Sequence, residues 1–116
     1  LEALLAAPHP IGGVNLKVVK HGGLMEAWAI GRRAAAAGLR VMVGGMVETR
    51  LGMSVAAALA AVFPGVLADL DTAWLLADDP FVGGYVAHGA RYRIGEGLGH
   101  GVVLRPPPSP CAAPIE

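Results

Sequence analysis

The chain has 116 residues, the length of one modest domain, and its nine basic and nine acidic residues give a formal net charge of zero. No basic stripe exists, so we expect no nucleic-acid partner. Although 54% of the residues are hydrophobic, charged residues interrupt each apolar run before it reaches the roughly 18–20 residues of a membrane span, and we expect no membrane association. The single cysteine, Cys111, cannot form an internal disulfide.

Short apolar segments alternate with helical stripes in the first third of the chain. Residues 1–7 have the pattern of a helix end that stops before Pro8 and Pro10. The β-branched run 14–19 is apolar on both faces, which predicts a buried parallel strand. A stripe of apolar and small residues then predicts a helix over 24–37, which ends before Gly38.

The same alternation continues through the middle of the chain. Residues 40–43 predict a second strand, Thr49 can cap a helix over 51–62 that Pro64 ends, and residues 67–70 predict a third strand. Short strand-like pieces around 85–86 and 92–94 precede a Pro-rich tail. This order is typical of an α/β fold with parallel strands, either doubly wound or a (β/α)8 barrel. A barrel needs about 250 residues, so this chain would form only part of one.

Charged and polar side chains stand where the first and third predicted strands end. Residues two apart in a strand point to the same face, so Asn15 and Lys17 are expected to share a face, as are Asp69 and Asp71. A lysine at the end of a buried strand is rare because a buried ammonium is costly, and such a lysine can act as a general acid or base. These groups therefore suit proton transfer on a charged small molecule.

Simpler interpretations stay open for each of these residues. Lys17 can extend its ammonium to solvent or pair with an acid, and the two aspartates can be a strand end and a helix cap. Glu48 follows a strand, so it either belongs to the site or begins the next helix with its charge at the positive end of the dipole. The four histidines have no zinc-site spacing, and no phosphate-binding fingerprint is present.

Four stretches together resemble the enolase superfamily in order and spacing. Residues 15–23 (NLKVVKHGG) are similar to its sixth barrel strand, and residues 42–52 (MVGGMVETRLG) to its seventh. Residues 69–72 (DLDT), followed by 75–80 (LLADDP), are similar to the eighth, and residues 97–99 (GLG) to the glycine signature near the family's C-terminus. The resemblance implies the C-terminal part of a (β/α)8 barrel, about three β/α units, over residues 1–104, with 105–116 as a Pro-rich tail.

Within the superfamily the chain most resembles the dipeptide epimerases of the L-Ala-D/L-Glu epimerase type. The resemblance implies that Lys17 is one of two acid/base lysines, and that Asp69 and Asp71 hold the substrate's α-ammonium. It also implies that Asn15 and Met46 contact the substrate, and that Mg²⁺ stabilises an enediolate through ligands upstream of this chain. Ala73 stands where the family usually has proline. An N-acylamino acid racemase, an o-succinylbenzoate synthase, a muconate cycloisomerase, an inactive fragment and a small binding module therefore remain alternatives.

We therefore expect this chain to be part of an isomerase that acts on a dipeptide. We expect the complete enzyme to be cytoplasmic and homo-oligomeric. This chain alone lacks the partner lysine and the metal-binding carboxylates that the resemblance implies, so we expect it to be inactive by itself.

Overall fold

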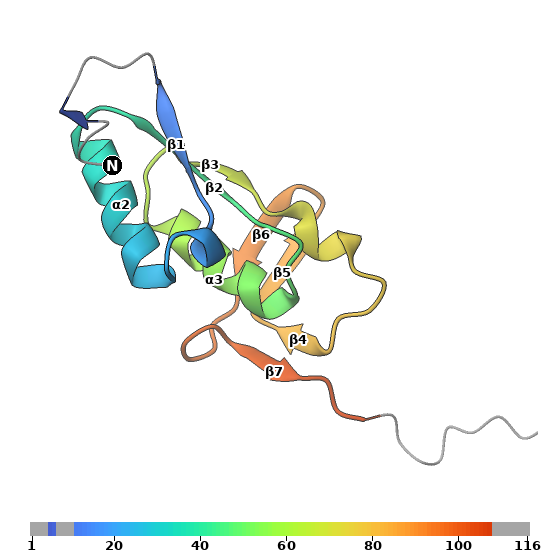
Figure 1. Cartoon of the computed structure of the whole chain (residues 1–116). Helices are drawn as coiled ribbons and strands as arrows, with labels where there is room; N and C mark the ends of the chain where they lie inside the picture. The colour runs from blue at the N-terminus through green and yellow to red at the C-terminus, as the bar shows by residue number, and fades with distance from the viewer. Residues whose placement is uncertain (1–4, 7–10, 108–116) are drawn as a thin grey trace, which may run out of the picture.

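The computed structural model describes residues 5–6 and 11–107, and these form a mixed α/β structure. In chain order its elements are β1 (Gly13–Leu16), the 3-10 helix η1 (Val18–Lys20), α2 (Leu24–Ala36), β2 (Arg40–Gly44), α3 (Arg50–Ala61), β3 (Leu67–Asp69), the 3-10 helix η2 (Asp71–Leu75), β4 (Phe81–Gly83), β5 (Tyr85–His88), β6 (Arg91–Ile94) and β7 (Val102–Leu104) (Figure 1).

The first three strands form a parallel sheet with β2 in the centre. Asn15 of β1 pairs with Met42 of β2, and Met42 pairs in turn with Leu67 of β3. Two residues further along, Gly44 is opposite Asp69. Since paired residues of neighbouring strands point to the same face, this register decides which side chains meet at the carboxyl end of the sheet.

Helices α2 and α3 cover one face of the sheet, and the core lies between the helices and the strands. Gly31 permits a close approach of α2, since a Cβ there would lie 2.5 Å from Phe63 Cζ and 2.7 Å from Leu16 Cδ1. The small buried residues of the predicted α2 stripe, Ala27 and Ala34, face the same way. The core contains Leu16, Ala27, Val41, Val43, Met53, Ala56, Ala57, Leu59, Ala60, Phe63, Leu70 and Tyr85.

Two antiparallel pairs follow the parallel sheet. Strand β4 pairs with β7, and β5 pairs with β6. Helix α3 contacts β4, β6 and β7 as well as β2 and β3, so it lies between the parallel sheet and the C-terminal strands (Figure 1). The C-terminal strands therefore take their position from α3.

The α/β class with parallel strands is confirmed, but the first strand was predicted too long. Strand β1 ends at Leu16, because the amides of Lys20 and His21 both donate to the Lys17 carbonyl, at 2.9 and 3.2 Å, and turn the chain into η1. The prediction that this strand is buried on both faces is also wrong. Asn15 is exposed because, in the described part of the chain, helices cover only the opposite face.

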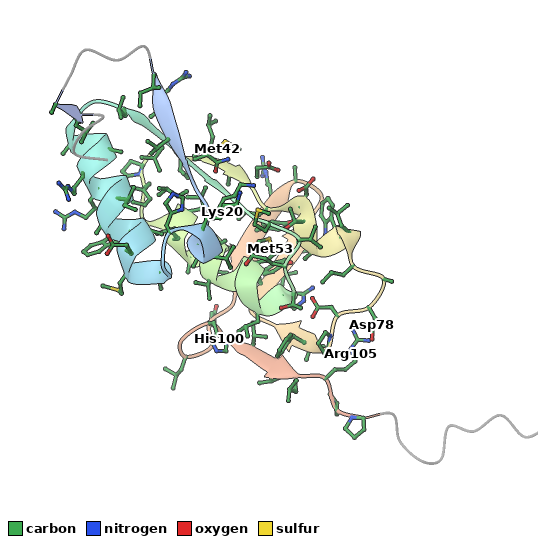
Figure 2. The ribbon with its side chains drawn as sticks, in the orientation of Figure 1. Lys20, Met42, Met53, Asp78, His100 and Arg105 are labelled. Atoms are coloured by element: carbon green, nitrogen blue, oxygen red, sulfur yellow. The ribbon has the colours of Figure 1, made fainter. Side chains whose placement is uncertain are left out.

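The short pairs at the C-terminal end were only partly predicted. Strands β5 and β6 were expected, whereas β4 and β7, of three residues each, were not. The start of the predicted tail is irregular, but it is attached to the domain: the Arg105 amide donates to the Pro80 carbonyl at 2.7 Å, and its guanidinium pairs with Asp78 at 3.2 Å (Figure 2). Residues 108–116, and all but Leu5 and Ala6 of the predicted helix end at 1–7, lie outside the described residues.

Within the described ranges, no helix is both long enough and apolar enough to cross a membrane.

The open sheet generates a prediction about the isolated chain. Strands β1 and β3 each have only one neighbour in the described sheet, and Leu67 is 58% exposed on the uncovered face. Unpaired edges and an uncovered face favour association over independent folding. We expect the purified chain to self-associate or to melt without a sharp transition, measured by circular dichroism after size-exclusion chromatography. A sharp cooperative melt of a monomer would contradict this expectation.

Candidate active site

The carboxyl end of the parallel sheet brings the predicted lysine and one predicted aspartate to the same row. Leu16 of β1 pairs with Val43 of β2, so the residues that follow them, Lys17 and Gly44, are in the next row. Gly44 is in turn opposite Asp69 of β3. The backbone at Lys17 is still extended, with φ −126° and ψ 111°, so strand alternation continues to this residue. The side chains of this row therefore point away from α2 and α3, on the face that also carries Asn15.

The two faces of the sheet differ in burial. Met42, in the row of Asn15, lies on the other side of the sheet from Met53 of α3 (Figure 2). Met53 is fully buried, whereas Met42 is half-buried. In a parallel α/β barrel, functional side chains gather at the carboxyl ends of the strands, which is where Lys17 and Asp69 lie.

The Lys17 ammonium is held by the loop that follows β2. Its Nζ donates to the Gly45 carbonyl at 2.6 Å and lies 3.8 Å from Met46 Sδ. The Lys17 amide donates to His21 Nδ1 at 3.1 Å, which anchors the turn after β1. Among the described residues, Lys17 forms no ion pair with a carboxylate. The lysine is thus positioned by neutral acceptors and is half-exposed toward the open face.

The loop between β2 and α3 is tied to both outer strands. The Gly45 amide donates to the Asp69 carbonyl at 3.2 Å, on the β3 side. On the β1 side, the Gly45 carbonyl accepts from Lys17 Nζ at 2.6 Å, and the Asn15 side-chain oxygen lies close to Gly44, where a Cβ would be 3.1 Å from it. Met46 is exposed at the tip of the loop, and its amide donates to Glu48 Oε1 at 2.9 Å.

Glu48 has contacts toward both of the places that the sequence left open for it: its Oε1 faces the loop after β2, and its Oε2 lies beside Gly52 in the first turn of α3. Helix α3 begins at Arg50, and Thr49 precedes it without a side-chain capping hydrogen bond. Instead, the Glu48 carboxylate closes the loop by accepting from the Met46 amide. Glu48 therefore shapes the segment whose Gly45 carbonyl holds the lysine.

The two aspartates differ in how they are held. Asp69 is the last residue of β3, whereas Asp71 begins η2. Between them, Leu70 is buried and has φ −121° and ψ 28°, which is not extended backbone. The strand alternation that was expected to align both side chains therefore stops at Asp69. Both carboxylates are exposed and lie two residues apart at the same end of the sheet.

Sequence reasoning missed the tyrosines that support this end of β3. The Tyr92 hydroxyl donates to the Leu70 carbonyl at 2.9 Å, and its ring lies 4.8 Å from that of Tyr85. Burial raises the pKa of Tyr92, and neighbouring Tyr85 and Asp71 raise it further. Burial also raises the pKa of Tyr85, an effect that Arg50 opposes. The only signal in the sequence was two tyrosines in short predicted strands, and this did not indicate a partner.

Two further features describe what this site can and cannot do alone. A hollow of about 380 Å³ opens beside β3, lined by both aspartates, Trp74 and Tyr92 among others, and it does not include Lys17. Within residues 5–6 and 11–107, no three His, Cys, Asp or Glu side chains gather closely enough to hold a metal ion. The arrangement offers a proton-transfer group and two carboxylates for a cation, but no metal centre of its own.

Comparisons with known proteins agree on one family. Residues 5–107 match the family model described as "Enolase C-terminal domain-like". The chain is 42% identical over 92 residues to the aromatic dipeptide epimerase of Herpetosiphon aurantiacus, which covers 78% of this chain and 26% of that protein. It is 43% identical over 88 residues to the L-Ala-D/L-amino acid epimerase of Populus trichocarpa, covering 75% of this chain and 21% of that protein.

A solved structure of a relative has the same fold over this region. The dipeptide epimerase of Methylococcus capsulatus, in complex with Mg and the dipeptide L-Arg-D-Lys, superposes with a TM-score of 0.82 at 37% identity. The superposition covers 88% of this chain and 29% of that one. The chain spans about a quarter of the length of the relatives that it matches, and its parallel sheet corresponds to part of their barrel. The chain belongs to the enolase superfamily, in the family of enolase C-terminal domain-like proteins.

Proposed function

We propose that this chain supplies the C-terminal part of the active site of a dipeptide epimerase, which inverts the α-carbon of one residue of its substrate. One observation carries the proposal: the sheet register brings the Lys17 ammonium and the Asp69 carboxylate to one row at the carboxyl ends of parallel strands. An epimerase of dipeptides needs both a proton-transfer group and a site for a free α-ammonium, and this row offers one of each.

Lys17 would act on the proton of the α-carbon. As the base, its Nζ would take this proton, and the electron pair of the broken C–H bond would pass into the neighbouring carboxylate, which becomes an enediolate. A second base on the other side of the carbon, from outside this chain, then returns a proton to the opposite face. The Gly45 carbonyl, 2.6 Å from Nζ, accepts a hydrogen bond from the lysine and fixes the direction from which it approaches.

Asp69 and Asp71 would hold the free α-ammonium of the dipeptide. Two neighbouring carboxylates favour a cationic partner, and each hydrogen bond between them and an ammonium is charge-assisted. Both side chains are exposed on the described surface and are thus available to a ligand. Asn15 and Met46 flank Lys17 and would contact the substrate beside the reacting carbon.

The described residues of this chain do not form a site for the Mg²⁺ that we propose for the complete enzyme. Mg²⁺ prefers near-octahedral oxygen coordination, and no group of three candidate ligands exists among the described residues. We assign both aspartates to the substrate. The ligands of Mg²⁺ would come from outside this chain.

The isolated chain tests whether it is only part of an enzyme. Because the second base and the metal ligands would lie outside it, we expect the purified chain with Mg²⁺ to epimerise no dipeptide. The measurement is the α-proton signal of the dipeptide in D₂O, which should persist. Robust exchange of the α-proton by this chain alone would contradict the proposal that it is a part of a larger site.

Removal of the lysine tests its role in proton transfer. In the complete enzyme, Lys17→Ala should lower kcat by about 10²–10⁴-fold or more, because loss of a general acid–base group typically costs this much, while the substrate Kd changes little. Lys20→Ala is the matched control: Lys20 is exposed in η1 beyond the end of β1 (Figure 2) and should keep near-parental turnover. Equal effects of the two variants would show that Lys17 has no special role.

Neutralising the aspartates tests the ammonium site and separates the rival activities. In the complete enzyme, Asp69→Asn with Asp71→Asn should lower kcat/KM for a dipeptide by about tenfold or more, since a charge-assisted hydrogen bond contributes about 1.5–3 kcal/mol. The N-acetylated dipeptide has no ammonium and should lose less. Equal losses for both substrates would mean that the aspartates are structural. A parent enzyme that prefers the N-acetylated form would point to an N-acylamino acid racemase.

A further inference from the structure

The aspartate pair needs a support that the parallel sheet does not provide. The sheet holds Asp69 directly, because its carbonyl accepts the Gly45 amide at 3.2 Å and it is opposite Gly44 in the ladder. Asp71 lies beyond the last ladder position, at the first residue of η2. The distance between the two carboxylates therefore depends on the conformation of Leu70, the single residue that joins the strand to η2.

Tyr92 fixes this residue from the side. Its hydroxyl donates a hydrogen bond of 2.9 Å to the Leu70 carbonyl, 22 residues away in sequence. The peptide unit is planar, so the Leu70 carbonyl and the Asp71 amide turn together. A hydrogen bond to that carbonyl consequently fixes the orientation of the peptide plane between Leu70 and Asp71. This orientation in turn sets the direction of the Asp71 side chain relative to Asp69.

The ring that carries this hydroxyl packs against two other aromatic rings. The Tyr92 ring lies between that of Tyr85, at 4.8 Å and 48°, and that of Trp74, at 6.3 Å and 82°. Tyr85 is only 4% exposed, and the Arg50 guanidinium lies 4.5 Å above its ring.

Arg50 extends this support to the start of α3. Its Nη1 donates to the carbonyls of Gly83 and Tyr85 at 2.9 and 2.7 Å, and its amide donates to Asp79 Oδ2 at 2.6 Å. Aromatic contacts, with the buried Tyr85 ring among them, and charge-assisted hydrogen bonds thus connect the C-terminal strands to the peptide between the two aspartates.

We propose that Tyr92 is a positioning residue for the Asp69–Asp71 pair, through which it sets the preference of the enzyme for substrates with a free α-ammonium. This inference rests on the proposed function of the pair. It predicts that the hydroxyl of Tyr92, rather than its ring, contributes to substrate choice. Tyr85 provides the contrast, since its ring is in the same stack but its hydroxyl has no hydrogen bond to any described residue of the site.

The test compares Tyr92→Phe with Tyr85→Phe in the complete enzyme. Each change removes one hydroxyl from the same aromatic stack and keeps the ring. For Tyr92→Phe we expect KM for a dipeptide to rise by about three- to tenfold, the range of one neutral hydrogen bond, with kcat changed less than twofold and the N-acetylated dipeptide unaffected. For Tyr85→Phe we expect no change in the ratio between the two substrates. Matching melting curves for the two variants would exclude a general loss of folding as the cause.

Hydrogen exchange gives a second readout that does not need substrate. Tyr92→Phe should speed amide exchange in residues 70–73, whereas Tyr85→Phe should leave these amides unchanged. Unaltered exchange in both variants would overturn the inference, as would an unaltered substrate ratio in Tyr92→Phe when the double aspartate variant does change that ratio. If the double aspartate variant has no effect on the ratio, the ammonium site itself is wrong, and that outcome overturns the proposed function together with this inference.

Discussion

Gly45 connects the two outer strands of the parallel sheet through its own backbone. Its amide donates to the Asp69 carbonyl at the end of β3, and its carbonyl accepts from Lys17 Nζ beyond the end of β1. A side chain here would displace its neighbours, because a Cβ would lie 2.6 Å from Thr72 Oγ1 and 3.1 Å from Met53 Sδ. The residue after the central strand thus links the Lys17 ammonium to the backbone of Asp69.

Helix α3 transmits the same constraint to the C-terminal strands. Its buried residues pack on β2, while Arg50 and Ser54 at its start contact the segment that follows η2. The Ser54 hydroxyl is buried and donates to the Arg50 carbonyl at 2.7 Å, so it requires no other partner. It lies against Gly84, where a Cβ would collide with it. The aspartates therefore lie between two supports, the sheet on one side and the strands that α3 positions on the other.

Local sequence signals predicted the parallel strands and the two long helices of this fold, but not every element and boundary. The stripe in α2 and the strands that carry the site could be predicted, because periodicity and turn residues act over a few positions. The end of β1 could not, since the carbonyl of Lys17 accepts two amides from the turn that follows.

A contact between residues distant in sequence explains what was missed at the site. The row of Lys17 and Asp69 follows from the strand register, whereas the sequence indicated only that both residues stand near the ends of predicted strands. Strand alternation failed at Asp71 because Leu70 leaves the extended conformation, and the Tyr92 hydroxyl that contacts Leu70 comes from a strand 22 residues later. No local pattern indicates a hydrogen bond across that separation.

The charges of the site explain why this chain would need the rest of a barrel. The proposed dipeptide substrate carries an α-ammonium and a carboxylate, and the row at the carboxyl end of the sheet offers it the Lys17 ammonium and the Asp69 carboxylate, with Asp71 two residues further on. In the proposed function the aspartates would hold the ammonium, whereas Lys17 would act at the reacting carbon and could not also neutralise an enediolate. A compensating positive charge would then come from outside this chain, on the uncovered face of the sheet. The open edges of β1 and β3, which leave that face accessible, are where further strands would extend the sheet around it.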